Sequence, residues 1–123
     1  MATLRKTRPI TVEEYLEGEM VGDIRHEFVG GDVYSMVGAS EPHNLIAGAF
    51  QAILYMHLLQ SGCRVFAGTM KLRIGDDFYY PDVFVACDRT DADLYFKRRP
   101  LLIVEVLSPG TAVRDAQDKL VAY

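Results

Sequence analysis

Hydrophobic residues recur at helical spacing in two parts of the chain and predict two helices. Thr11 followed by Glu14 is a capping-box pattern, and the apolar residues that follow occupy one face of a short helix bounded by Gly18 and Gly22. The stretch 42–60 carries apolar residues at intervals of three and four, which predicts a longer helix that stops before a serine and a glycine. The second of these helices has the clearer periodicity.

The remaining hydrophobic residues alternate with polar ones or stand in short runs, as in β-strands. Two such runs between Ile24 and Met36 flank Gly30 and Gly31, which readily adopt the positive φ of a two-residue hairpin turn. After the long helix we expect strands at 64–67, 70–74 and 78–86 in an antiparallel meander, a polar loop with at most one helical turn at 88–99, a strand at 101–107 buried on both faces, and a helix at 112–123. This order of elements predicts an α+β domain.

The composition is that of one globular domain. The chain has 123 residues, of which 50% are hydrophobic and 24% are charged, so a single domain over residues 1–123 can bury a core without a metal or a disulfide. The formal net charge is −4, which argues against binding nucleic acid by bulk electrostatics. Local basic runs stand at 5–8 and 97–99, and each is more typical of a solvated tail or loop.

Neither the cysteines nor the apolar runs indicate an oxidising or a membrane environment. Cys63 and Cys87 have no CxxC spacing and no cysteine–histidine cluster, so two buried thiols are expected rather than a disulfide or a zinc site. The longest apolar run, 101–107, is far shorter than the ~20 residues of a membrane span, and no apolar signal core follows the basic residues near the amino terminus. We therefore expect a cytoplasmic protein.

Two acidic residues and a lysine stand where folding alone does not require a charge. Asp82 follows Pro81 at the start of a strand that enters the core, and Glu105 interrupts an apolar strand, where an ionised carboxylate is costly unless it binds a cation or hydrogen-bond donors. Lys119 lies on the next predicted helix, which can return to the same strand end. Two carboxylates with a nearby lysine suit a Mg²⁺ or Mn²⁺ site for phosphodiester hydrolysis. In the structural alternative, Asp82 caps a turn, Glu105 pairs with an arginine and Lys119 is solvated.

Short motifs spread over nearly the whole chain match one bacterial protein family. They are Pro81-Asp82-Val83, the run IVEVLSP at 103–109, Arg114-Asp115, Asp118-Lys119-Leu120 with Tyr123, HEFV at 26–29 before GDVY at 31–34, and Pro42-His43. This set resembles the Uma-type family, whose members are classed as endonucleases of the PD-(D/E)xK superfamily. The resemblance implies an α+β fold with a restriction-endonuclease-like core, in which helices flank a mixed central sheet and a short helix and a β-hairpin come first.

The resemblance also implies roles for individual residues. Asp82 and Glu105 would be the metal ligands, with Mg²⁺ or Mn²⁺ as the cofactor. Leu107 stands where the superfamily usually has a lysine two residues after the glutamate, and Lys119 is similar to the lysine that replaces it on the following helix. Glu27 is the candidate for an additional acidic residue, as a ligand, a water-positioning group or simply a charge on the hairpin face.

Two further side chains have open assignments. His43 could contact phosphate, hold the site by a hydrogen bond, or be a capping or surface histidine. Asp115 could pair with Lys119 at i,i+4 spacing or join the site, and the pair is favoured.

The hypothesis from the sequence is a divalent-metal-dependent nuclease that hydrolyses phosphodiester bonds, with DNA expected ahead of RNA. The alternative is a catalytically inactive, nuclease-derived module for oligomerisation or nucleic-acid binding. Relatives in the family continue past the position of Tyr123 into at least one more strand. We therefore expect an exposed sheet edge and a homo-oligomer or a swapped edge.

Overall fold

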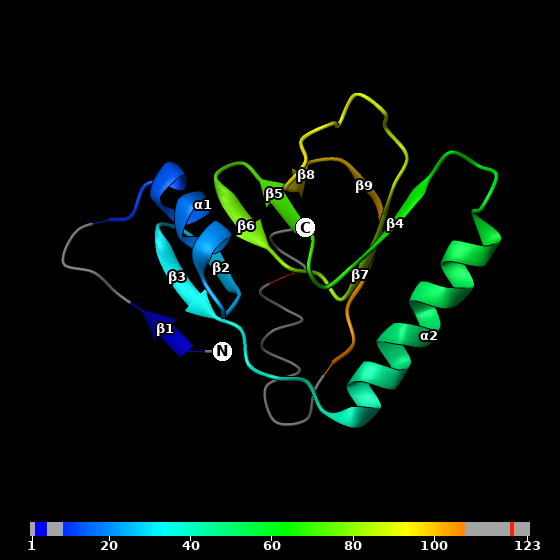
Figure 1. Cartoon of the computed structure of the whole chain (residues 1–123), viewed down its shortest axis with the longest axis horizontal. Coiled ribbons are helices and arrows are strands. Elements are labelled where there is room, and N and C mark those ends of the chain that lie inside the picture. Colours follow the sequence, from blue (N-terminus) through cyan, green and yellow to red (C-terminus); the bar gives the residue numbers. More distant parts are fainter. Residues whose placement is uncertain (1, 5–8, 108–118, 120–123) are drawn as a thin grey trace. The chain divides into compact units, whose positions relative to one another are not determined.

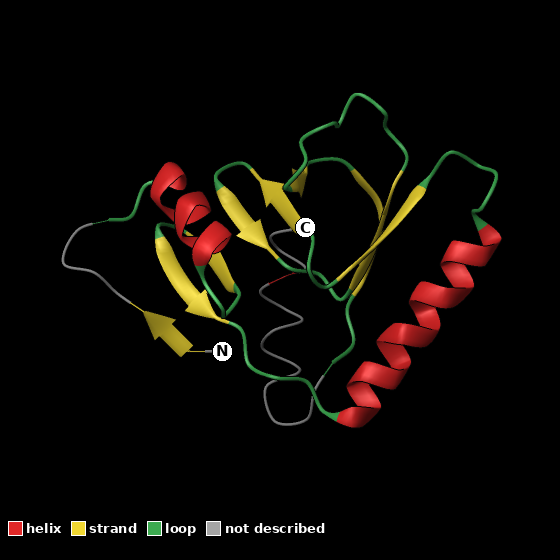
Figure 2. Ribbon diagram, in the orientation of Figure 1, coloured by secondary structure: helices red, strands yellow, loops and turns green. Residues whose placement is uncertain are grey.

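The computed structural model describes residues 2–4, 9–107 and 119 (Figures 1 and 2). The chain forms two compact units, one comprising residues 1–38 and 73–79 and the other residues 39–72 and 80–123. The prediction of one domain over 1–123 stays a prediction. None of the helices in the described ranges is long and apolar enough to cross a membrane.

The first unit contains the short helix α1 (Val12–Val21), which forms where the capping-box pattern predicts it. The Thr11 side chain accepts a hydrogen bond from the Glu14 backbone N–H at 3.1 Å, and the Glu14 carboxylate accepts one from the Thr11 N–H at 3.2 Å. The helix ends at Gly22, whose N–H donates to the Gly18 carbonyl at 2.9 Å. Gly18 lies inside the helix rather than at its end, because an internal glycine weakens a helix without interrupting its hydrogen bonds.

The predicted hairpin is confirmed as strands β2 (His26–Val29) and β3 (Asp32–Ser35). Its turn has φ of +61° at Gly30 and +85° at Gly31, which are values that side chains with a Cβ rarely adopt. Strand β1 (Ala2–Leu4) pairs with the outer side of β3, and β6 (Asp77–Tyr79) pairs with β2. All three pairings are antiparallel.

Aromatic rings form the core of this unit. The ring of Tyr15 on α1 lies 4.9 Å from that of Phe28 on β2 and 5.1 Å from that of Phe78 on β6. All three residues are buried, and the Tyr15 hydroxyl donates to the His26 carbonyl. The helix is thus anchored to the hairpin both by ring packing and by a hydrogen bond that satisfies the buried hydroxyl.

The second unit is built on an antiparallel sheet of three strands in the order β4-β7-β9, with bounds Arg64–Ala67, Val83–Ala86 and Pro100–Val104. The central strand β7 has four buried residues in succession. The long helix α2 (Glu41–His57) packs against β4 and β7. Strand β8 (Phe96–Lys97) pairs in parallel with the first residues of β5 (Lys71–Ile74).

The strand predicted at 78–86 is two strands, β6 and β7, and the predicted meander is therefore wrong in its connectivity. The break falls at Tyr80-Pro81-Asp82. Proline has no N–H for a β-ladder, so pairing stops there and resumes at Val83 with a different partner. Strand β7 pairs with β4 and β9, whereas β6 pairs with β2.

The strand predicted at 101–107 is also shorter and more exposed than expected. Strand β9 ends at Val104 and is an edge of the described β4-β7-β9 sheet. Leu101 is 71% exposed, so the prediction of burial on both faces is wrong. An apolar run of this length is compatible with either a central or an edge strand, and only the strand order distinguishes them.

Residues 88–99 form turns and the short strand β8, with no helical turn among them. The helix predicted at 112–123, the alternatives for Asp115 and the basic run at 5–8 lie outside the described residues, except that Lys119 is described and is helical.

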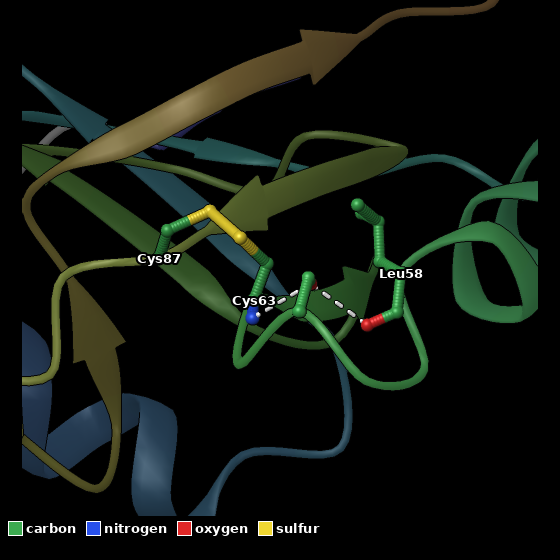
Figure 3. Close-up of a disulfide and its surroundings, with 4 residues drawn as sticks. Leu58, Cys63 and Cys87 are labelled. Atoms are coloured by element: carbon green, nitrogen blue, oxygen red, sulfur yellow. Dashed lines mark hydrogen bonds between the residues drawn. A yellow bond between two sulfur atoms is a disulfide. The ribbon is translucent and has the colours of Figure 1, made fainter.

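The prediction of two separate thiols is wrong, because Cys63 and Cys87 form a disulfide (Figure 3). The pair Arg64↔Ala86 ends the ladder between β4 and β7, and the two cysteines are the next residues beyond it, with their Cα atoms 4.1 Å apart. The turn before Cys63 is held by Ser61, whose hydroxyl donates to the Leu58 carbonyl at 2.8 Å and accepts from the Cys63 N–H at 3.1 Å. Antiparallel pairing thus joins residues that are 24 positions apart in the sequence.

Candidate metal and phosphodiester site

Asp82 and Glu105 flank the last residue pair of two neighbouring strands. Val83 at the start of β7 faces Val104 at the end of β9, so Asp82 and Glu105 stand next to that pair, at the same end of the two strands. The Val106 backbone N–H donates to Asp82 Oδ2 at 2.7 Å, which ties the segment around Glu105 to Asp82. The structure therefore brings together the two carboxylates that the sequence nominates.

His43 from α2 joins the same place. Ser40 caps the helix, with its hydroxyl accepting from the His43 N–H at 3.3 Å, so the imidazole lies in the first helical turn. Its Nε2 atom lies 3.2 Å from Asp82 Oδ2. Of the alternatives for His43, this contact fits a role in holding a site carboxylate, and a contact with phosphate stays a prediction. Proximity in space is the only signal that could have selected it, since His43 and Asp82 are distant in the sequence.

The two contacts of Asp82 are made by the same oxygen. Both the Val106 N–H and His43 Nε2 approach Oδ2. Within the described part of the chain, Oδ1 is the oxygen of this side chain that remains for a further ligand. A carboxylate fixed through one oxygen presents the other in a defined direction, which is a useful property in a metal ligand.

Lys119 reaches Glu105, as the sequence predicts. Its Nζ lies 3.3 Å from Glu105 Oε1, and both side chains are about one fifth exposed, at 19% and 22%. The ammonium offsets part of the negative charge that two adjacent carboxylates create. The predicted group of Asp82, Glu105 and Lys119 is therefore assembled within one unit, although this contact by itself does not decide between a catalytic and a structural role.

The position of Glu27 leaves its role a prediction. It lies on β2 in the first unit and is 1% exposed. Leu107, at the position where the superfamily usually has a lysine, is exposed. Lys119 is the lysine that the structure places beside Glu105.

The donor set suits a cation that retains water. Among the residues that the structure describes, no three histidine, cysteine, aspartate or glutamate side chains form a ready metal cage. Mg²⁺ does not require one, because it commonly binds through one or two carboxylates and completes its octahedron with waters and substrate phosphate oxygens. The paired carboxylates of Asp82 and Glu105 fit this mode and do not fit a closed zinc site.

The basic run at 97–99 is mostly engaged in its own loop. The ammonium of Lys97 is buried and donates to the carbonyls of Asp91 and Asp93. Arg99 lies 3.7 Å from Asp88, and hydrogen bonds from Thr90 hold the pKa of Asp88 below its usual value. The basic run at 97–99 is therefore part of a loop, as expected, rather than a free cationic patch.

The helices and sheets described above form an α+β protein with a restriction-endonuclease-like fold, and this fold carries the paired carboxylates. A solved structure with a similar fold is titled as a putative nuclease belonging to DUF820, from Anabaena variabilis. The TM-score is 0.73 at 17% sequence identity, and the match covers 92% of this chain and 66% of that chain.

The chain belongs to the Uma2 family, whose description is "Putative restriction endonuclease" and whose model matches residues 12–123. Two relatives are uncharacterised proteins of Synechocystis. One, slr1290, is 34% identical over 93% of this chain, and the other, sll1609, is 30% identical over all of it. This chain spans 62% and 72% of their respective lengths.

Proposed function

We propose that this chain carries the active site of a divalent-metal-dependent nuclease that hydrolyses phosphodiester bonds, with DNA preferred to RNA. The observation that carries the proposal is the meeting of Asp82 and Glu105 at the same end of two neighbouring strands, with Lys119 3.3 Å from Glu105. Family membership supports the same chemistry. A cytoplasmic location belongs to this proposal on the remaining ground that no apolar signal core follows the basic residues near the amino terminus, since the Cys63–Cys87 disulfide removes the argument from free thiols.

The two carboxylates would hold Mg²⁺ or Mn²⁺. When bound, such an ion supplies positive charge at the phosphate and lowers the pKa of a water molecule. Asp82 is oriented for this role because the Val106 N–H and His43 fix its Oδ2. His43 acts here as a positioning residue, since its contact is with the carboxylate.

Lys119 would stabilise the negative charge that develops on the phosphoryl oxygens. Its ammonium already lies in the site through Glu105, so little reorganisation is needed when substrate arrives. The net charge of −4 disfavours binding by bulk electrostatics, so local cationic groups, this lysine and the bound ion among them, would supply the phosphate contacts.

Metal binding tests the proposal without a choice of substrate. Mn²⁺ is titrated into the purified chain by calorimetry, beside Asp82→Asn and Glu105→Gln, which keep the size of each side chain. We expect saturable binding that both substitutions abolish or weaken at least tenfold. Asp76→Asn is the matched control, because Asp76 is exposed and belongs to the first unit. Binding that survives both site substitutions would contradict the assignment of the ligands.

Activity is then tested on supercoiled plasmid and on single-stranded DNA and RNA, with Mg²⁺, Mn²⁺ or a chelator. Lys119→Met should retain Mn²⁺ binding and lose cleavage, since it removes the ammonium and keeps the apolar stem. Metal binding without cleavage of any substrate would instead favour the alternative function, a catalytically inactive module. Absence of metal binding in the unsubstituted chain would refute the proposed site.

A further inference from the structure

Helix α2 has two apolar sides, of which the sheet covers one. The partly buried residues His43, Ala47, Leu54 and Leu58 follow one side of the helix, which packs on β4 and β7 (Figure 1). Other large apolar residues of the helix lie off that side and are each between 46% and 67% exposed: Leu45, Ile46, Ile53 and Met56. A monomeric soluble protein rarely leaves such a helix face in water.

The exposed face contains one regular ridge. Glu41, Leu45, Ala49, Ile53 and His57 are spaced four residues apart, and all five are exposed. Rows of side chains at this spacing interdigitate in the commonest class of helix packing. The ridge has an acidic residue at its start, a histidine at its end and a small residue at its centre.

We propose that this ridge packs against the same ridge of a second copy of the chain, in an antiparallel pair with its two-fold axis at Ala49. A two-fold axis at Ala49 pairs every position of the ridge with a ridge position of the second copy. Leu45 faces Ile53 of the second copy, Glu41 lies toward the second His57, and the small Ala49 side chains let the backbones approach at the crossing. Antiparallel packing also sets the helix dipoles in opposite directions, which is favourable.

The size and charge of the surface support a second copy as the occupant. At roughly 200 Å² for each large residue, the exposed apolar area of Leu45, Ile46, Ile53 and Met56 is about 500 Å², the larger part of the ~800 Å² that each partner buries in a standard interface. Glu41 is the one formally charged residue of the 17 in α2. Two copies can therefore meet along the helix without opposing like charges at its centre.

The oligomeric state of the chain and of exposed-site variants tests the proposal. Light scattering after size exclusion should give about twice the chain mass of 13.8 kDa. Leu45→Glu and Ile53→Glu should each yield a monomer with an unchanged circular dichroism spectrum, since both side chains are exposed and their loss leaves the core intact. Leu94→Glu is the matched control at an 80% exposed position away from α2 and should remain a dimer.

Crosslinking tests the axis itself. Ala49→Cys should form an intermolecular crosslink with a short bis-maleimide in high yield, because position 49 meets its own copy. Met56→Cys should crosslink at least several-fold less, because position 56 lies near position 42 of the second copy. Equal yields would indicate parallel helices and overturn the antiparallel arrangement.

Three results would overturn the interface. The first is a monomer at all concentrations, which would leave the face to a different partner. The second is a dimer that persists in both glutamate variants. The third is a dimer lost in Leu101→Glu and retained in the α2 variants, since Leu101 lies on the edge strand β9 and would report pairing through the sheet edge.

Discussion

Reduction of the Cys63–Cys87 disulfide should destabilise the chain strongly. The bond closes a loop across 24 positions between β4 and β7, and such a closure reduces the conformational entropy of the unfolded chain. The loop-entropy relation gives about 3.5 kcal/mol at 25 °C for this length. With a urea dependence of about 2 kcal/mol/M, the unfolding midpoint should fall by roughly 1.7 M.

The assay is urea unfolding with and without dithiothreitol. Circular dichroism is the suitable probe, because the chain has no tryptophan. The double variant Cys63→Ser/Cys87→Ser is the control, and it should unfold near the midpoint of the reduced protein in either buffer. A thiol count in denaturant, without reductant, gives the state of the two cysteines directly.

Two outcomes would refute this reasoning. Two free thiols per unreduced chain would mean that the bond does not form in solution. An intact bond whose reduction leaves the midpoint unchanged would mean that strain in the folded state, or residual structure that already closes the loop in the unfolded state, cancels the entropic gain.

Two further substitutions test how each unit is stabilised. Thr11→Ala removes the hydroxyl that accepts from the Glu14 N–H and leaves the bond from the Thr11 N–H to the Glu14 carboxylate. The substitution should cost about 1 kcal/mol of unfolding free energy, and Thr11→Ser should restore most of it. An unchanged urea midpoint would show that the side-chain cap is dispensable. Phe84→Ala deletes a fully buried ring on β7 whose centroid lies 5.0 Å from that of Phe66. The substitution should lower the free energy of unfolding by about 3–5 kcal/mol. A loss below about 1 kcal/mol in the same unfolding experiment would mean that the sheet can close around the cavity.

Local signals in the sequence were sufficient for several elements. The capping box of α1, the Gly30-Gly31 turn and the periodicity of α2 each involve residues within a few positions of one another, and each prediction is confirmed. The motif around Asp82 and the run around Glu105 also identified the family. Short-range backbone preferences and apolar spacing are properties that the chain carries before it folds.

Strand pairing was beyond those signals. Pro81 divides one apolar stretch into β6 and β7, and the partner of β7 is β4, which precedes it by some twenty residues. That pairing also brings Cys63 to Cys87 and leaves β9 at an edge of the described sheet. The spacing of the two cysteines favoured free thiols. Spacing along the chain carries no information about which residues face each other in a sheet, so the disulfide could not be foreseen from it.

The amino-acid sequence alone was enough to predict helices α1 and α2, the hairpin, the family and the two acidic residues Asp82 and Glu105. The contact between His43 and Asp82 and the exposure of one side of α2 became known from the three-dimensional structure alone. The physical reason is the same in each case. A side chain's partner across the fold depends on strand register and helix orientation, which arise from the sum of many weak contacts and leave no local mark in the sequence.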